Sequence, residues 1–216
     1  MQRRKKKRDK PLFQIEDWKP RTRVGRLVRD EAITSMEALF SQNYTVEEKE
    51  IVDVLMNNVI EKVVDVSRVQ RQTDAGRKTV FRATAIVGNG DGYIGVGDGK
   101  AQGVGVAIRQ AIEKSKTNII PVKRGCGSWE CLCKSSHSVP FLVEGKTASC
   151  QVILMPAPRG LGLVIGDTGK LVLRLAGISD VWSKTHGETR TVANFCLATF
   201  KALKQTYGIP RPQEWG

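Results

Sequence analysis

Eight glycines fall within residues 88–105, and this stretch limits the possible fold more strongly than any other feature of the chain. Its segment Gly90–Gly95 matches the pattern G-x-G-x-x-G by letter. Dinucleotide binding needs that pattern between a strand and the N-terminus of a helix, whereas Tyr93–Val96 is predicted to be a strand. We therefore interpret the glycines as formers of tight turns between short strands. A compatible interpretation is that a backbone without side chains approaches a sugar–phosphate chain closely.

The distribution of charge indicates a polyanionic partner. The chain has 35 Lys and Arg against 22 Asp and Glu, a formal net charge of +13. Residues 1–29 carry twelve basic and three acidic side chains, residues 30–66 carry two and nine, and residues 67–216 carry 21 and ten. Cations that neutralise phosphates release bound counterions, which drives association with nucleic acid.

Several other classes of protein are excluded or disfavoured by composition. No run of 18 apolar residues exists, so we expect no membrane span. The basic N-terminus lacks the apolar segment of a secretory signal, although Arg3–Arg8 is also compatible with a nuclear-localisation signal. Five cysteines, three of them close together, do not predict a disulfide framework, so we expect a cytoplasmic protein.

The first 58 residues divide into a basic tail and a helical extension. The tail, residues 1–29, has too few apolar side chains at its start to fold in isolation. Its apolar residues Phe13, Ile15 and Trp18 either dock against a partner or pack on the chain's own body. In the extension, residues 30–58, Thr45 and Glu48 have the spacing of a helical capping box.

Apolar residues at helical spacing follow this capping box as far as Val63. They predict an amphipathic helix with an acidic outer face. This face is expected to be turned away from RNA or toward a basic protein, or simply to be solvated, which is the more common case.

Residues 59–122 are predicted to form a domain that resembles a double-stranded-RNA-binding fold. Lys62–Gln70 and Thr79–Val87 read as two strands, joined by the basic turn Arg71–Lys78. A third strand at Tyr93–Val96 and a helix over about 101–116 complete the order helix, three antiparallel strands, helix.

A separate α+β unit is expected over residues 138–208. Ser138–Val143 and Thr147–Met155 read as strands, and a short strand is expected at Leu163–Ile165. Asp167 is a predicted N-cap for a helix that Gly177 closes. A strand over 178–181 and a helix over 191–207 follow, and residues 209–216 form a C-terminal tail.

The linker, residues 123–137, contains a cluster of candidate metal ligands. Cys126, Cys131, Cys133 and His137 follow the spacing C-x4-C-x-C-x3-H. Three thiolates and an imidazole suit a structural zinc ion, but the spacing lacks the C-x-x-C knuckle of familiar zinc sites. Two interpretations stay open: a structural zinc site, or cysteines that pack as small hydrophobic residues.

The sequence offers little for catalysis and much for binding. Its two histidines have no carboxylate pair nearby in sequence, and no cofactor is required by any motif. Cations instead gather in a hairpin and several loops, where contacts to phosphate position a protein on RNA without reading its sequence. These candidate RNA-binding residues are Arg68, Arg71, Arg77, Lys78, Arg82, Lys123, Arg124, Arg159, Lys184 and Arg190.

Three segments resemble a known family when they are taken together. The segments are Asn89–Ala101, Pro156–Gly162 and Leu175–Val181, and Gly76–Lys78 with Phe81 resembles the same family's basic hairpin. The family is that of universal ribosomal protein five of the small subunit. The N-terminal extension and the cysteine cluster resemble its archaeal-type branch.

The resemblance implies a fold, a location and further contacts. It implies that the second α+β domain contains a left-handed βαβ crossover, against the general right-handed rule. It also implies a non-enzymatic constituent of the small ribosomal subunit that binds rRNA, touches ribosomal proteins three and four and mRNA at the entry channel, and supports translational accuracy. Gln72, Asn89 and Lys100 join the candidate RNA contacts on this basis. Gly99-Lys100-Ala101 replaces the Lys-Lys pair of free duplex-RNA binders, which favours a fixed rRNA site.

Two other hypotheses compete with this one. The chain could be a free-standing regulator that binds duplex RNA, which comparable affinity for any RNA duplex would support. It could instead be a small enzyme acting on RNA or a nucleotide, for which loss of turnover on substituting His137 would be the signature.

Overall fold

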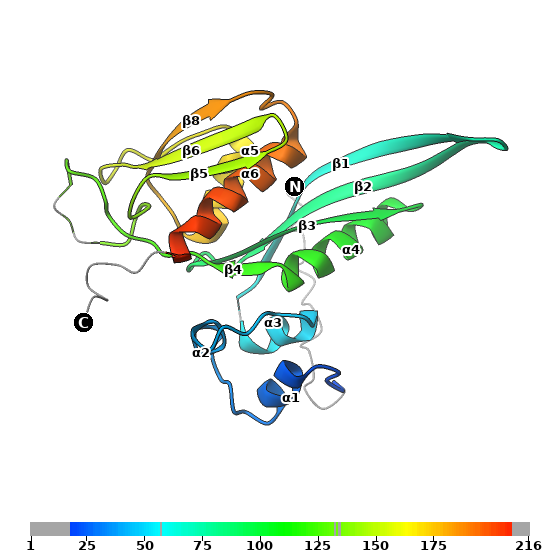
Figure 1. Ribbon diagram of the computed structural model, residues 1–216, viewed down its shortest axis with the longest axis horizontal. Helices are drawn as coiled ribbons and strands as arrows, with labels where there is room; N and C mark the ends of the chain where they lie inside the picture. The colour runs from blue at the N-terminus through cyan, green and yellow to red at the C-terminus, as the bar shows by residue number, and fades with distance from the viewer. Residues whose placement is uncertain (1–17, 57, 132, 134, 209–216) are drawn as a thin grey trace, which may run out of the picture.

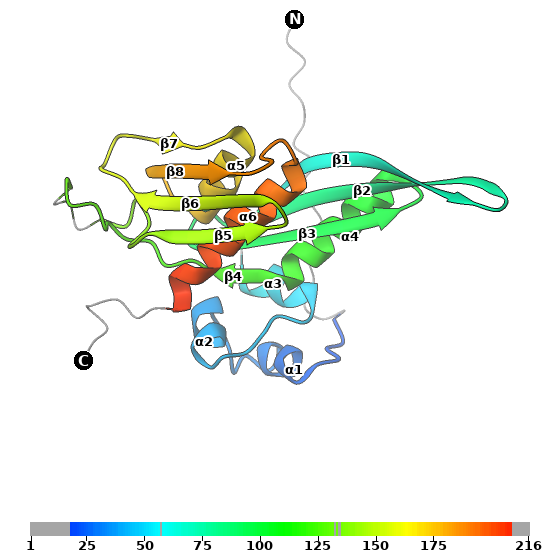
Figure 2. The ribbon, with the colours of Figure 1, turned by 45° about the horizontal axis from the view of Figure 1, so that its top comes forward.

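The computed structural model describes residues 18–56, 58–131, 133 and 135–208 of the chain. They form an elongated α+β molecule with two four-stranded sheets, as Figures 1 and 2 show. The predictions for the basic tail up to residue 17, including Phe13 and Ile15, and for the tail 209–216 concern residues outside these ranges. Trp18 is inside them and is 6% exposed, so it packs on the chain's own body.

The first sheet is antiparallel and has the strand order β1-β2-β3-β4. Its elements are β1 (Ile60–Thr73), β2 (Gly76–Gly88), β3 (Tyr93–Ala101), α4 (Val104–Thr117) and β4 (Ile119–Pro121). The predicted succession of three strands and a helix is confirmed, with two differences. β3 continues through Ala101 because it pairs with β2 as far as Phe81, so the helix begins three residues later than expected. The segment β4, where no strand was expected, adds a fourth strand beside β3.

The glycines of β3 let helix α4 lie directly on the strand. Gly95, Gly97 and Gly99 alternate along β3, and a Cβ on each would overlap main-chain atoms of α4. Small residues on α4, Ala107 and Ala111, face them and are fully buried. The eight-glycine stretch is therefore explained in part by close helix-on-sheet packing, which larger side chains would prevent.

Three short helices precede β1 in the described residues: α1 (Arg23–Arg29) lies in the predicted basic tail, and α2 (Met36–Ser41) and α3 (Lys49–Leu55) lie in the helical extension. The prediction of one long helix from Thr45 to Val63 was wrong. Glu48 is the N-cap of α3, but its carboxylate accepts the main-chain N–H groups of Arg21 and Thr22 at 2.8 and 2.7 Å and makes no capping bond. The apolar residues after α3 belong to β1, since Ile60 and Val63 pair with β2.

The second sheet has the order β5-β6-β8-β7. Its strands are β5 (Val143–Thr147), β6 (Cys150–Pro156), β7 (Leu163–Val164) and β8 (Val181–His186). The prediction of a strand at Ser138–Val143 was wrong, because Pro140 interrupts it and Val139 is buried in a loop. The expected strand over 178–181 was also wrong. Ile178 donates its N–H to the carbonyl of Leu173 and closes the preceding helix instead.

Two helices, α5 (Asp167–Ala176) and α6 (Val192–Gln205), cover one face of this sheet. The expected helix over 167–176 is confirmed and ends at Gly177, whose φ of 80° suits glycine. Its N-cap is Gly166, so Asp167 is the first helical residue and not the cap. The parallel pairing of β7 and β8 around α5 gives a βαβ unit, and its left hand remains a prediction from the family resemblance.

Helices α5 and α6 lie between the two sheets, and the largest hydrophobic core joins residues of both, among them Ile86, Val96, Leu154 and Leu173. The turn after β2 is fixed to the end of α5, where Gly90 and Gly92 donate their N–H groups to the carbonyls of Leu175 and Ala176. No helix in the described part of the chain has both the length and the apolarity needed to cross a bilayer.

Candidate RNA-binding surface and metal centre

The outer part of the β1–β2 hairpin leaves the body of the protein as a two-stranded ribbon, residues 68–81. The last residue of β3, Ala101, pairs with Phe81, which in turn pairs with Arg68. Beyond that point none of the described residues adds a third strand, and five further residue pairs extend the ribbon by roughly 16 Å at about 3.3 Å per residue. Figure 1 shows the ribbon reaching past β3 and α4 at one end of the molecule.

The pairing register places cations on both faces of this ribbon. Residues that face each other across antiparallel strands share a face, and faces alternate along each strand. Arg71 pairs with Lys78 on one face, while Arg68, Gln72 and Arg77 lie on the other. These five side chains are exposed, and within the described part of the chain none of the four cations forms an ion pair with a carboxylate.

Two more predicted residues continue the face of Arg71 and Lys78 toward the body. Arg82 lies on β2 opposite Lys100 on β3. Lys100 is exposed, whereas Arg82 is half-buried and donates to Asp98 at 3.2 Å. The sequence therefore placed these cations correctly beside one hairpin, but only the register shows which of them share a face.

Three predicted RNA contacts lie instead at the junction between the two sheets. The Asn89 side chain accepts the N–H groups of Asp91 and Tyr93 at 2.8 and 3.1 Å, so it shapes the turn. Arg124 is paired with Asp91, and the ammonium of Lys123 lies 5.4 Å from the centre of the Tyr207 ring. These contacts hold the turn and the linker together, which gives the three residues a structural role.

The remaining predicted cations are exposed on the second domain and are not brought together. Arg159 belongs to the β6–β7 loop. Figure 1 shows this loop at the end of the second sheet away from the ribbon. Lys184 lies on β8, and Arg190 belongs to the loop between β8 and α6. Figure 2 shows this loop at the end of the sheet nearer the ribbon.

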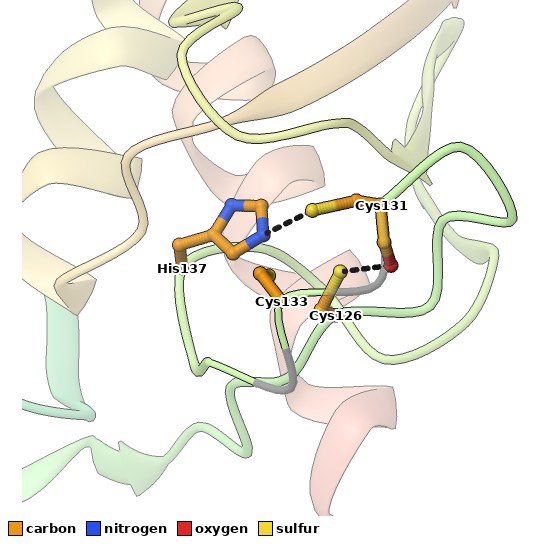
Figure 3. A group of neighbouring side chains, drawn as sticks. All are labelled: Cys126, Cys131, Cys133 and His137. Atoms are coloured by element: carbon orange, nitrogen blue, oxygen red, sulfur yellow. Dashed lines mark hydrogen bonds between the residues drawn. The ribbon is translucent and has the colours of Figure 1, made fainter.

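The four candidate metal ligands converge at the base of one loop. Gly125 and Ser138 exchange both of their main-chain hydrogen bonds at 2.9 Å, which closes the loop, and Cys126 and His137 lie just inside this closure. The thiols of Cys126, Cys131 and Cys133 and a ring nitrogen of His137 all lie within 4.8 Å of one another. Figure 3 shows the sulfur of Cys131 facing Nε2 of His137, and the two atoms are 3.8 Å apart.

These distances suit a tetrahedral ion. Zn–S bonds of about 2.3 Å place two tetrahedral ligand atoms roughly 3.8 Å apart. Hydrogen bonds from Ser135 and Cys131 lower the pKa of the Cys133 thiol to about 6, whereas burial raises the pKa of the Cys126 thiol to about 11, so the support for a metal comes from the geometry. The donor set and its geometry therefore fit zinc.

Burial separates these cysteines from the other two. Cys150 and Cys196 are fully buried in the core, as expected, and burial raises the pKa of Cys196 to about 12. Cys126, Cys131 and Cys133 are only half-buried. The hydrophobic-packing interpretation therefore suits the core pair and fits the cluster poorly.

Asp180 is a part of this site that sequence reasoning did not find. The residue is 4% exposed, and its carboxylate lies 2.8 Å from Nδ1 of His137. Burial acts to raise the pKa of Asp180, but hydrogen bonds from the Gly162 N–H and from His137 outweigh it, and the pKa is lowered. The signal for it in the sequence was an acidic residue placed between the apolar residues Ile178 and Val181. The structure shows that both of these neighbours are buried.

Comparison with known proteins gives a consistent answer. The family model described as Ribosomal protein S5, N-terminal domain, matches residues 59–123, and the model of the Ribosomal protein S5, C-terminal domain, matches residues 145–213. A protein of Aeropyrum pernix called small ribosomal subunit protein uS5 is 57% identical over 201 residues, 93% of this chain and 92% of its own length.

Two further proteins with the same name show similar likeness. The one from Hyperthermus butylicus is 56% identical and covers 93% of this chain and 94% of its own length. The one from Metallosphaera sedula is 49% identical and covers 95% and 96%.

Proposed function

This chain belongs to the ribosomal protein S5 family and is a structural, non-enzymatic constituent of the small ribosomal subunit, and we propose that the ribbon of residues 68–81 is its principal rRNA-binding arm. As part of the ribosome it works in the cytoplasm. The observation that carries the proposal is the set of exposed cations without carboxylate partners on an arm that projects from the folded body.

The physical chemistry of RNA suits such an arm. A two-stranded ribbon offers cations on both faces, so it can contact phosphates on two sides when it lies between RNA segments. Such contacts fix position through the backbone, which agrees with the small number of aromatic side chains in the ribbon. Lys100, Arg159, Lys184 and Arg190 are proposed to add outlying phosphate contacts from the body.

The proposal is tested with the full chain and a small-subunit rRNA fragment at several salt concentrations. Replacing Arg71 and Lys78 with Gln removes two facing cations, so the slope of log affinity against log salt should become shallower by about 1.5. The control variant replaces Lys146 and Lys204, two exposed cations of the second domain, with Gln. An equal loss of slope in both variants would contradict a principal role for the ribbon.

The competing functions receive no support from the described structure. Gly90–Gly95 leads into β3 and not into a helix, so the geometry of a dinucleotide site is missing there. His137 contacts Asp180 and the thiol of Cys131, but the thiols of Cys126 and Cys133 converge on the same point, which suits a set of metal ligands better than a nucleophile with its base.

A finer placement within the subunit is also proposed. Contacts with ribosomal proteins three and four and with mRNA at the entry channel, and a role in accuracy, are what the family resemblance implies. The outer face of the second sheet can serve a protein contact, since Val164 and Trp182 pair across β7 and β8 and are each 41% exposed. A crosslinker attached at position 182 should react with protein four in intact subunits. Crosslinks from this position to rRNA alone would contradict the placement.

The cysteine cluster is proposed to hold one structural zinc ion, bound by Cys126, Cys131, Cys133 and His137. Its support is the convergence of four ligand atoms on a loop that buries little else. All four positions are protein ligands, as in closed structural sites, so the ion would stabilise the loop and would not activate water. Metal analysis of the chain purified under reducing conditions should find one zinc per chain; a metal-free folded chain would favour simple packing of the thiols.

A further inference from the structure

We propose that the metal centre also fixes the shape of the β6–β7 loop, residues 157–162, through the pair His137–Asp180, so that the position of Arg159 depends on the metal. This inference rests on the proposed zinc site. It concerns what the ion does for a neighbouring segment that supplies none of its ligands.

The first link is the orientation of the imidazole. Nε2 of His137 faces the thiols, and Nδ1 faces the carboxylate of Asp180 at 2.8 Å. A carboxylate can only accept, so Nδ1 donates and Nε2 presents the free lone pair that a metal needs. One aspartate therefore sets the tautomer of the ligand.

The second link joins the same aspartate to the loop. Oδ1 of Asp180 accepts the N–H groups of Gly160 and Gly162 at 3.1 and 2.8 Å. Both glycines have left-handed backbone angles, with φ of 90° and 80°, and they have no side chains with which to anchor the loop. Arg159 is exposed, so its side chain does not anchor the loop. The main-chain bonds of Gly160 and Gly162 to Asp180 instead hold the loop conformation that presents Arg159.

The third link is made by the main chain of the ligand. The carbonyl of His137 accepts the N–H groups of Ser179 and Asp180 at 3.0 and 3.2 Å. The side chain of Ser138, the next residue, accepts the N–H of Ala157 at 3.2 Å. The loop is thus attached at its first residue to the segment that carries the ligand, and at its last residue to Asp180, which that segment binds.

The segment itself has few other means of staying in place. Between Cys126 and Ser136 none of the described residues is fully buried, and its Trp129 side chain is 89% exposed. Without a cross-link at the ligands, little apolar burial opposes movement of this segment, and the imidazole of His137, although buried, meets on its Nε2 side a thiol that belongs to the same segment. With the ion bound, the imidazole is fixed and the two N–H bonds of the loop are maintained.

Hydrogen exchange measured on the full chain tests this inference. The zinc-loaded protein is compared with protein treated with a chelator under reducing conditions, and exchange is followed at Gly160 and Gly162 by NMR. We expect these two amides to lose protection on metal removal, while amides of α6 and of the ribbon keep theirs.

A matched pair of variants adds a second readout. An amide at position 180 cannot accept from His137 and from both glycines at once, so Asp180→Asn should speed exchange at Gly160 and Gly162 even with excess zinc. It should also weaken zinc binding about 10- to 100-fold, as loss of such a partner typically does. Asp167→Asn, the same change at an exposed aspartate that bonds Lys170, should leave both quantities unchanged.

The outcomes separate the two proposals. Failure of the wild-type chain to bind zinc would overturn the zinc site and this inference together. Zinc binding with unchanged exchange at Gly160 and Gly162 after chelation would overturn only the inference. An equal loss of protection across α6 would likewise overturn it, because the effect would then be global.

Discussion

The carboxylate of Glu48 accepts the indole N–H of Trp18 at 3.0 Å across 30 residues of sequence. The same carboxylate also binds the main chain of Arg21 and Thr22, so one side chain fixes the start of the described N-terminal segment. These bonds hold the segment just before α1 against the start of α3.

Glu48→Gln should therefore destabilise the N-terminal helices, by about 1–2 kcal/mol if charged hydrogen bonds behave as usual. Burial acts to raise the pKa of Glu48, but the hydrogen bonds from Thr22, Arg21 and Trp18 outweigh it, and the pKa is lowered. The stabilisation is thus complete above the ordinary carboxyl pKa and is lost as pH falls through the lowered folded-state value. Trp fluorescence during acid titration measures this loss, which the Gln variant should lack; Glu47→Gln, at an exposed neighbour, is the control.

Gly97→Ala should destabilise the first domain. A Cβ there would overlap main-chain atoms of Ser115 and Ala111, which cannot move without shifting α4, so we expect a loss of about 1–3 kcal/mol. Gly105→Ala is the matched change in α4 where nothing lies within 4 Å. Chemical denaturation should show that variant to be as stable as wild type or slightly more so; equal losses would argue against close packing as the reason for the glycines.

Lys116→Met should be strongly destabilising although it buries a more apolar side chain. Lys116 as a residue is only 9% exposed. Its ammonium lies 2.6 Å from the carboxylate of Asp53 and 3.4 Å from that of Glu61. Its removal leaves two partly buried carboxylates near each other, and we expect a cost of about 2 kcal/mol or more in the free energy of unfolding. Adding Asp53→Asn to this variant should recover part of the loss, and no recovery would contradict the electrostatic explanation.

Shortening the ribbon should weaken RNA binding without affecting the fold. Deleting Gln70–Thr73 and Gly76–Thr79 removes four matched pairs, so register and faces are kept, and an Asn-Gly turn can replace Asp74-Ala75. Thermal stability should stay near that of wild type because the ribbon contributes little to the core. The slope of log affinity against log salt should become shallower by roughly 2–3, since three cations are lost.

Thiol titration should divide the cysteines into two groups. In the folded metal-free chain a thiol reagent should modify Cys126, Cys131 and Cys133, which are half-buried, and spare Cys150 and Cys196 until the protein unfolds. Added zinc should protect the first three and have no effect on the other two. Five equally reactive thiols in the folded chain would contradict the arrangement described.

Local patterns predicted the parts of the fold that depend on near neighbours. The α5 helix and its glycine end, the β1–β2 hairpin with its cations, and the C-terminal helix were all expected from spacing and turn residues. The expected boundaries failed where distant contacts prevail. The capping box at Thr45 was overridden because Glu48 binds the main chain of residues 21 and 22, and the apolar segment at Ser138–Val143 was buried in a loop without joining a sheet.

The candidate sites divide in the same way. The sequence alone determined the excess of positive charge, the basic hairpin, the ligand set Cys126, Cys131, Cys133 and His137, and the resemblance to the family. Only the tertiary structure decided that Arg124 and Asn89 serve a domain junction and that the cations of the ribbon lie on two faces. It also decided that Asp180, 43 residues from His137, orients that ligand. The physical reason is that charge and ligand type belong to single residues, whereas burial, register and hydrogen-bond partners arise when the chain brings distant segments together.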